Sequence, residues 1–193
     1  MALRPFLIAA LAALLSLNMA PHGYAGDKTQ EAVRTAEHLL SDAHAALGAS
    51  NRPALRAAIN TAFAFDVWER FLIQNRQDAF APAERQEFRG LLPGFLAHLY
   101  QDQFQRGLSA APTLGEARAV RRDVLVSSQF PRSNGGELPV EWRIREFPGR
   151  GSQVIDVMVA GTSFLLLKRD EFTAIIDQGG AEALLVHMRE RSF

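Results

Sequence analysis

Histidines and isolated carboxylates are the side chains in this 193-residue chain that could carry out metal or acid–base chemistry. Four histidines follow residue 25, at His38, His44, His98 and His187, and none shows HExxH or His-x-His spacing. The first two are six residues apart, which does not place them on one helical face as a spacing of four would. We therefore expect no metal site and no cofactor.

Asp156 is a carboxylate in an otherwise apolar stretch. A buried carboxylate with a raised pKa can act as a general acid or base, but it would need Tyr100 or a histidine within hydrogen-bond reach. A single carboxylate without a visible partner is more often a structural hydrogen-bonding residue. The chain also lacks cysteine, a GxGxxG loop after a strand, a Walker lysine loop and a GxSxG elbow. These observations predict that the protein is not an enzyme.

Composition predicts a folded domain with no attraction for polyanions. Hydrophobic residues make up 48% of the chain, and 21 basic residues balance 21 acidic ones. The apolar fraction is sufficient for a buried core, whereas nucleic-acid binders usually carry a basic stripe or a positive domain. We expect no nucleic-acid partner.

The first 25 residues have the pattern of a secretory signal peptide. A basic residue at Arg4 precedes an apolar run from Phe6 to Leu17, and Gly23-Tyr24-Ala25 places small residues at the −3 and −1 positions of a cleavage site. The run is shorter than the roughly 20 apolar residues that span a bilayer, so a permanent anchor is the weaker interpretation. We expect residues 1–25 to be removed, residues 26–193 to form the domain, and the protein to be located in the periplasm.

The first half of the domain, about residues 27–112, is expected to be helical. Apolar spacings of three and four predict helices over 29–47, 53–63, from 66 onward and 82–104. Pro93 and Gly94 lie inside the last of these. Because proline lacks an N–H and clashes with the preceding turn, we expect a kink or a break near Leu92.

A sheet half, about residues 113–169, follows with a period of two. It predicts four antiparallel strands over 116–128, 138–147, 153–159 and 162–167, joined by short turns. C-terminal helices, about residues 170–190, are expected at 172–177 and 181–189, separated by Gly179-Gly180. The fold class is therefore α+β, with a curved four-stranded antiparallel sheet packed against a layer of helices.

Phenylalanine is abundant, with 13 residues, and most of them lie in the helical half. They could form a filled core, which is the usual arrangement, or the wall of an apolar cavity. The last two expected strands are apolar on both faces, and a bent helix can stand away from a curved sheet. A gap between the two layers is therefore a second possibility.

Motifs along most of the chain resemble those of the MlaC family. The resemblance lies in the segments 82–88 (PAERQEF), 124–129 (VLVSSQ), 140–145 (VEWRIR), 154–163 (VIDVMVAGTS) and 169–180 (RDEFTAIIDQGG), together with Tyr100. The family's L-G-x-x-W stretch is absent, since residues 71–76 read FLIQNR and the tryptophan comes earlier, at Trp68.

The resemblance implies a periplasmic phospholipid carrier with an NTF2-like apolar cavity, no cofactor and no reaction. It further implies that the carrier serves an ABC transport system, with inner-membrane MlaD-type and outer-membrane MlaA-type complexes as partners. We expect a monomer. Shielding some thirty methylenes at about 0.8 kcal/mol each, on the order of 25 kcal/mol, requires a deep apolar pocket rather than a surface patch.

The lipid-binding residues that we predict are apolar side chains of the strands and of the helical half. They are Phe71, Leu92, Phe95, Leu96, Tyr100, Val140, Trp142, Ile144, Val157, Val159, Phe164 and Leu166. About half of them are expected to contact the ligand, because one face of an element lines only one side of a cavity. Three alternatives stay open: a hopanoid or other lipid carrier, an NTF2-like enzyme, and a scaffold or chaperone with a filled interior.

Overall fold

The computed structural model describes residues 23–107 and 110–193, and the expected signal peptide therefore lies almost wholly outside the described residues. In chain order the elements are α1 (Gly23–Gly48), α2 (Arg52–Ala62), α3 (Phe65–Leu72), the short 3₁₀ helix η1 (Gln77–Ala79), α4 (Pro82–Gly107), β1 (Thr113–Val120), β2 (Asp123–Pro131), β3 (Glu137–Phe147), β4 (Gly151–Val159), β5 (Thr162–Ser163) and α5 (Phe164–Arg189). Within the described ranges, no helix combines the length and the apolar character that crossing a bilayer requires.

The strands form one antiparallel meander in the order β1-β2-β3-β4-β5. This arrangement confirms the α+β class, but the sheet has five strands and not the expected four. The single strand expected over 116–128 is two strands, because the chain turns at Arg121 and Arg122 and pairs Val120 with Asp123. Arg121 adopts a positive φ of 56°, a turn conformation that the alternating valines around it do not reveal. The expected NTF2-like character stays a prediction.

The strand expected over 162–167 is also corrected, since only Thr162 and Ser163 pair with β4 and a helix begins at Phe164. Ser163 caps this helix by accepting a hydrogen bond from the backbone N–H of Leu166, at 3.1 Å. A short apolar run such as 164–167 is compatible with either a strand or a helix, and here the cap decides in favour of the helix.

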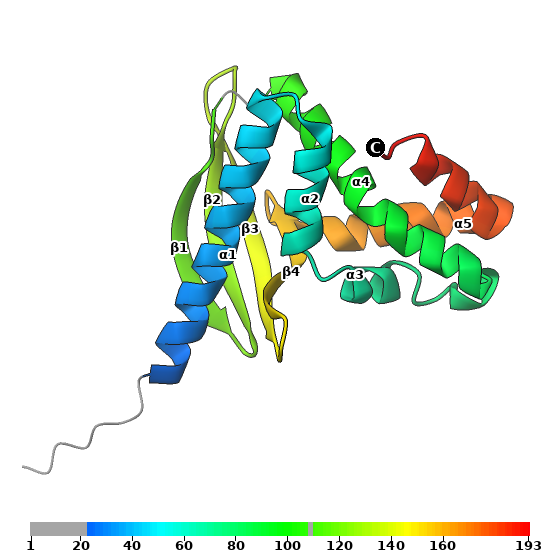
Figure 1. Ribbon diagram of the computed structural model, residues 1–193, viewed down its shortest axis with the longest axis horizontal. Coiled ribbons are helices and arrows are strands. Elements are labelled where there is room, and N and C mark those ends of the chain that lie inside the picture. The colour runs from blue at the N-terminus through cyan, green and yellow to red at the C-terminus, as the bar shows by residue number, and fades with distance from the viewer. Residues whose placement is uncertain (1–22, 108–109) are drawn as a thin grey trace, which may run out of the picture.

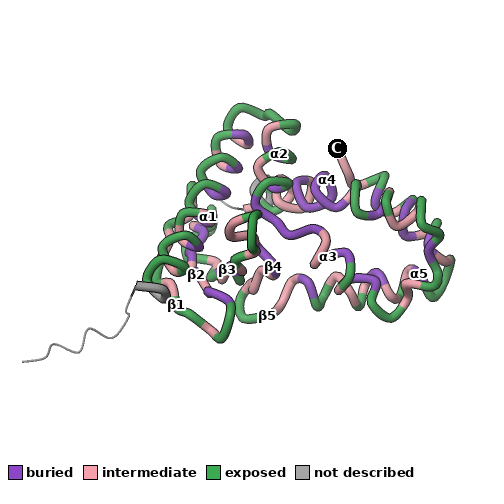
Figure 2. The backbone as a smooth tube through the Cα atoms, turned by 60° about the horizontal axis from the view of Figure 1, so that its bottom comes forward, coloured by how far each residue is buried: buried purple, intermediate pink, exposed green. Residues whose placement is uncertain are grey.

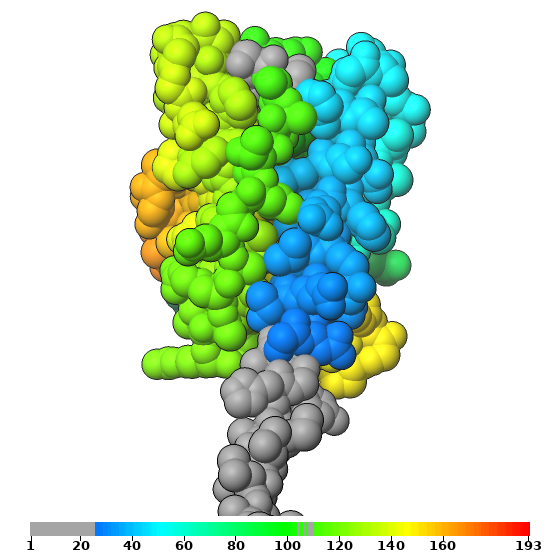
Figure 3. Space-filling view, turned by 90° about the vertical axis from the view of Figure 1, so that its left-hand side faces the viewer, coloured from blue at the N-terminus to red at the C-terminus, as the bar shows by residue number. Residues whose placement is uncertain are grey.

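Helix α1 lies along the sheet, whereas α4 and α5 extend away from it (Figure 1). On the outer side α1 lies beside the edge strand β1 (Figure 3). Buried positions recur along α4 and α5, which face each other (Figure 2). There Phe172 of α5 contacts Phe88 and Phe95 of α4 at ring-centroid distances of 6.0 and 5.6 Å.

Two carboxylates are buried within this framework, and each is paired with two arginines. Glu69 of α3 is fully buried and accepts hydrogen bonds from Arg85, at 2.9 and 3.1 Å, and from Arg89. These pairs fasten α3 to the N-terminal half of α4. A buried carboxylate is tolerated only when it is paired in this way, because its desolvation is costly.

Asp123, at the start of β2, is the second buried carboxylate and accepts hydrogen bonds from Arg143, at 2.7 Å, and Arg145, at 2.6 Å. Burial raises the pKa of Asp123, but the hydrogen bonds from Arg145 and Arg143 outweigh it and hold the pKa below its usual value. The start of β2 is thereby fixed to β3.

Of the kink or break expected near Leu92, the break does not occur, because helix α4 continues through Pro93. Side chains from other elements bond to the carbonyls beside the proline: Arg56 donates to Gly90 at 3.2 Å and Ser192 donates to Leu91 at 3.3 Å. Gly94 lets the segment after α5 approach closely, because a Cβ at this position would clash with Ser192 Oγ and lie 2.6 Å from the carbonyl oxygen of Phe193. The helix therefore continues through a residue that usually interrupts one.

Helix α5 does change direction at the expected glycine pair. Gly179 (φ −144°, ψ 15°) and Gly180 (φ 72°, ψ −170°) depart from helical geometry and divide α5 into two helical halves. Only glycine readily adopts the conformation of Gly180. The second half then folds back so that His187 lies 3.5 Å from Glu171 of the first half.

Candidate functional site

An apolar pocket of about 150 Å³ lies between the helices and the sheet. Five helices and two strands contribute to it, together with Phe63, which follows α2. Its fourteen lining residues are Leu39, Leu40, Ala43, Ile59, Phe63, Trp68, Leu96, Leu99, Tyr100, Gln103, Trp142, Val157, Val159 and Phe164. No lining residue carries a formal charge, so the pocket suits a hydrocarbon ligand.

The floor of the pocket is made by residues that are buried, and its indole N–H groups are already bonded. Trp142 donates to Ser128 Oγ at 2.9 Å, and Ser128 in turn donates to the carbonyl of Val140 at 3.0 Å. Trp68 donates to the carbonyl of Val154 at 3.3 Å. Because these polar atoms have partners in the protein, the floor offers carbon surface to a ligand.

The rim of the pocket is made by residues that are only partly buried or exposed. Leu99 and Tyr100 of α4 lie on one side, with the exposed Gln103, and Val159 and Phe164 lie on the other. Burial raises the pKa of Tyr100 to about 12, so its phenol stays protonated at neutral pH. The pocket therefore reaches solvent between the C-terminal part of α4 and the junction of β4 with α5.

Six of the twelve predicted lipid-binding residues line this pocket. They are Leu96, Tyr100, Trp142, Val157, Val159 and Phe164. Phe164 reaches the pocket from the first residue of α5 and not from the expected strand. A lipid contact at these positions stays a prediction.

The other six predicted residues lie elsewhere in the fold. They are Phe71, Leu92, Phe95, Val140, Ile144 and Leu166. Phe95 packs between α4 and α5, and Phe71 lies under the guanidinium of Arg169 at 5.1 Å. Leu166 is 41% exposed on α5, which differs from its expected place in a strand. These residues belong to core or surface around the pocket.

Sequence reasoning missed the contribution of α1 and α2 to the pocket. Leu39, Leu40 and Ala43 of α1 and Ile59 of α2 are all buried and line its floor. The apolar face of α1 was visible in the sequence, but nothing there distinguished residues that pack against protein from residues that face a gap. The small side chain of Ala43 is the one local signal, since it leaves space.

Asp156 has a structural role and caps α5. Its carboxylate accepts hydrogen bonds from the hydroxyl of Ser163 at 2.7 Å, the N–H of Leu165 at 3.2 Å and the N–H of Val157 at 2.8 Å. These bonds join β4 to the N-terminus of α5. The carboxylate is thus engaged with β4 and α5, as the structural interpretation of the sequence predicts.

Among residues 23–107 and 110–193, no three His, Asp or Glu side chains are arranged so that they could hold a metal ion. His187 packs against the rings of Phe95 and Phe172, and its Nε2 lies 3.5 Å from a carboxylate oxygen of Glu171.

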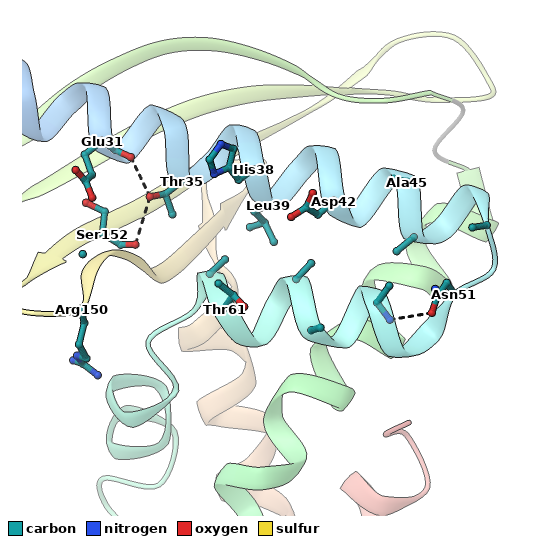
Figure 4. Close-up of a pocket in the computed structure, with 17 residues that line it drawn as sticks. Glu31, Thr35, His38, Leu39, Asp42, Ala45, Asn51, Thr61, Arg150 and Ser152 are labelled. Atoms are coloured by element: carbon teal, nitrogen blue, oxygen red, sulfur yellow. Dashed lines mark hydrogen bonds between the residues drawn. The ribbon is translucent and has the colours of Figure 1, made fainter.

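A second hollow of about 650 Å³ lies between α1, α2 and the start of β4 (Figure 4). Its floor is rich in alanine, and its border carries the polar side chains of Glu31, His38, Asp42 and Arg150. Thr35 bridges the elements here by donating to the carbonyl of Ser152 at 3.4 Å. This groove is a polar, open surface, unlike the apolar pocket.

The fold and the pocket define an α+β domain whose layers border an uncharged pocket open to solvent. The family model described as MlaC protein matches residues 30–190. The chain belongs to the MlaC family. No curated protein sequence matches it.

A solved structure with a similar fold is the phospholipid-binding protein from Ralstonia solanacearum in complex with a phospholipid. The TM-score is 0.68 at 17% sequence identity, and the alignment covers 85% of this chain and 96% of that chain. At this identity the similarity is one of fold.

Proposed function

We propose that this protein binds a phospholipid by enclosing its acyl chains in the apolar pocket. The observation that carries this proposal is the uncharged lining of fourteen residues, whose buried indole N–H groups are bonded to protein. Membership of the MlaC family and the phospholipid bound by the similar solved structure support it. The protein acts as a carrier, and we assign it no reaction.

The physical demand on a carrier explains why the pocket is apolar and lacks ligands for a head group. Covering some thirty methylenes at about 0.8 kcal/mol each is worth on the order of 25 kcal/mol. A head group left in water at the rim needs no dedicated charge, and Tyr100 and Gln103 are the polar side chains among the lining residues. The carrier is therefore selective for hydrocarbon tails.

The pocket must widen to hold a whole lipid. Its volume of about 150 Å³ is below the roughly 300–1,000 Å³ of pockets that hold drug-sized ligands. We propose that α4 is the wall that moves, because it supplies one side of the rim and contains Pro93. Widening would separate Leu99 and Tyr100 of α4 from Val159 and Phe164.

The cellular role that we propose is transport across the periplasm. The signal-peptide pattern of residues 1–25 would export the chain, and the family resemblance implies MlaD-type and MlaA-type complexes as donor and acceptor. A measured mass that corresponds to a chain beginning at Gly26 would support this location. A protein that retains Met1 and stays in the cytoplasm would contradict it.

Native mass spectrometry of protein purified from a bacterial periplasm, followed by solvent extraction, tests the proposed ligand. Ala43→Phe places a ring into the pocket from α1, and Ala45→Phe places the same ring on the exposed face of that helix. We expect one phospholipid per chain on the wild type and on Ala45→Phe. We expect little or none on Ala43→Phe, with cooperative thermal unfolding retained.

Each outcome separates the alternatives. A pentacyclic lipid in the extract would identify the ligand as a hopanoid instead of a phospholipid. A polar metabolite would favour the alternative that the protein is an enzyme, and a wild-type protein without a ligand would favour a scaffold. Undiminished lipid on a folded Ala43→Phe would place the lipid outside this pocket.

A further inference from the structure

The first turn of α5 exposes two adjacent leucines. Leu166 is 41% and Leu167 is 56% exposed, and they are two of three large hydrophobic residues exposed in the part of the chain that the structure describes. The third, Val186, is 43% exposed and lies in the second half of α5. Two neighbouring exposed leucines on one turn form a patch, which single exposed residues do not.

The leucine pair continues the rim of the apolar pocket. Phe164 lines the pocket, and Leu167 follows it by three residues in the same helix, which places both on one side of α5. Val157 and Val159 of β4 are partly buried and also line the pocket. The exposed patch therefore lies next to the pocket opening in the first turn of α5.

The whole corner between β4 and α5 is electrically neutral. Residues 157–167, which we call the β4–α5 corner, read VMVAGTSFLLL and contain no charged side chain. The next four residues cancel in charge, since Lys168 pairs with Glu171 at 2.6 Å and Arg169 pairs with Asp170 at 3.0 Å. An uncharged apolar tip suits a zwitterionic surface better than an acidic or basic protein partner.

The corner is also held in a fixed shape. Ala160 (φ 49°) and Gly161 (φ 81°) form a two-residue hairpin turn, and Ala160 donates to the carbonyl of Pro139 at 2.9 Å. Asp156 bonds both Ser163 and the N–H of Leu165 at the start of α5. Because the backbone of the corner is already ordered, little conformational entropy is lost when it enters a membrane.

We propose that the β4–α5 corner inserts into the surface of a zwitterionic phospholipid bilayer, with Leu166 and Leu167 entering the acyl boundary. This inference rests on the proposed function, because it places the opening of the proposed lipid pocket against a membrane surface. The driving force is apolar, so the binding needs no anionic lipid and is insensitive to salt.

Co-flotation of the full chain with phosphatidylcholine vesicles tests the proposal. The variant Leu166→Ser/Leu167→Ser should lower the partition coefficient about tenfold, whereas Val186→Ser, the matched control on the same helix, should leave it unchanged. Adding 0.5 M NaCl, which shortens the electrostatic screening length to roughly 4 Å, should not weaken wild-type binding. Failure of the wild type to bind, equal binding by the double variant, or loss of binding in salt would overturn the proposal.

A second measurement uses the absence of cysteine from the chain. An environment-sensitive fluorophore on Leu167→Cys should shift to the blue when phosphatidylcholine vesicles are added, and the same fluorophore on Val186→Cys should not. Equal spectra at both positions would exclude insertion at the corner, even if the serine variant failed to fold.

Lipid extracted from the purified variants separates this inference from the proposed function. The double serine variant should keep its bound phospholipid, because neither leucine lines the pocket. If the protein carries lipid but does not bind vesicles, insertion of the β4–α5 corner is refuted and the proposed carrier function is not. If the protein binds vesicles but is never purified with lipid, the proposed carrier function is refuted.

Discussion

Helices α4 and α5 each span 26 residues, and each contains a pair of residues that disfavour a helix, yet only α5 has non-helical dihedral angles at its pair. At Pro93, donors from Arg56 and Ser192 bond to neighbouring carbonyls and the helix continues. At Gly180, the backbone has a conformation that no helix contains. Pro93 removes only the bond to the carbonyl of Arg89, four residues earlier, and the helix tolerates that single loss, whereas the backbone reversal in α5 needs a residue without a Cβ.

Gly180→Ala should give the largest effect, because it introduces a Cβ at a φ of 72° and a ψ of −170°. We expect the free energy of unfolding to fall by about 1–3 kcal/mol, measured by chemical denaturation. Gly90→Ala in α4 is the matched control, since a Cβ there meets nothing within 4 Å, and it should stabilise by about 0.5–1 kcal/mol. Equal effects at both glycines would remove the distinction between the two helices.

Ser192→Ala and Arg56→Ala should each have an intermediate effect, because each removes a donor from a carbonyl beside Pro93. We expect the free energy of unfolding to fall by about 0.5–1.5 kcal/mol for each bond removed. Hydrogen exchange should become faster at the amides of residues 94–96 than at those in the rest of α4. Unchanged exchange in both variants would show that α4 passes Pro93 without this help.

The smallest effect concerns the pH dependence of the contact between the two helices. Burial lowers the pKa of His187, with Arg191 and Lys168 acting in the same direction and Glu171 and Glu190 opposing. The unfolded chain then binds a proton at a higher pH than the folded chain. His187 therefore contributes stability above pH 6.5 that is lost as the pH falls through its lower folded value.

Thermal unfolding of the wild type and His187→Gln between pH 7.5 and pH 5 checks this sign. The wild type should lose stability with falling pH more steeply than the variant, because glutamine has no proton to bind in this range. An equal slope for both proteins would assign the pH dependence to other groups.

Local signals predicted most of the fold. The glycine pair at 179–180, the strand from 138 to 147 and the helix from Pro82 were all visible, because turn residues and apolar periodicity are properties of neighbouring residues. The expected strand at 162–167 was wrong because the decision for a helix depends on Ser163 and on Asp156, which approaches from another strand. Contacts between distant residues left no trace in the local pattern.

The pocket shows the same limit. Trp142, Val157 and Tyr100 were predicted from their places on apolar faces, but so was Phe95, which packs against Phe172 instead. A face that lines a gap and a face that fills a core have the same composition. The distinction depends on how far apart two layers stand, which no single element determines.

Pro93 also separates the part of α4 that is anchored to α3 from the part that lines the pocket. The residues that anchor the helix, Arg85 and Arg89, precede the proline, and the pocket residues Leu96, Leu99 and Tyr100 follow it. Because a proline leaves one rung of the helical ladder unmade, bending is easiest there. We therefore expect that a rotation at Pro93 would displace Tyr100, near the pocket opening, more than Leu96, which is closer to the proline, while Arg85 and Arg89 keep the N-terminal part of α4 fixed to α3.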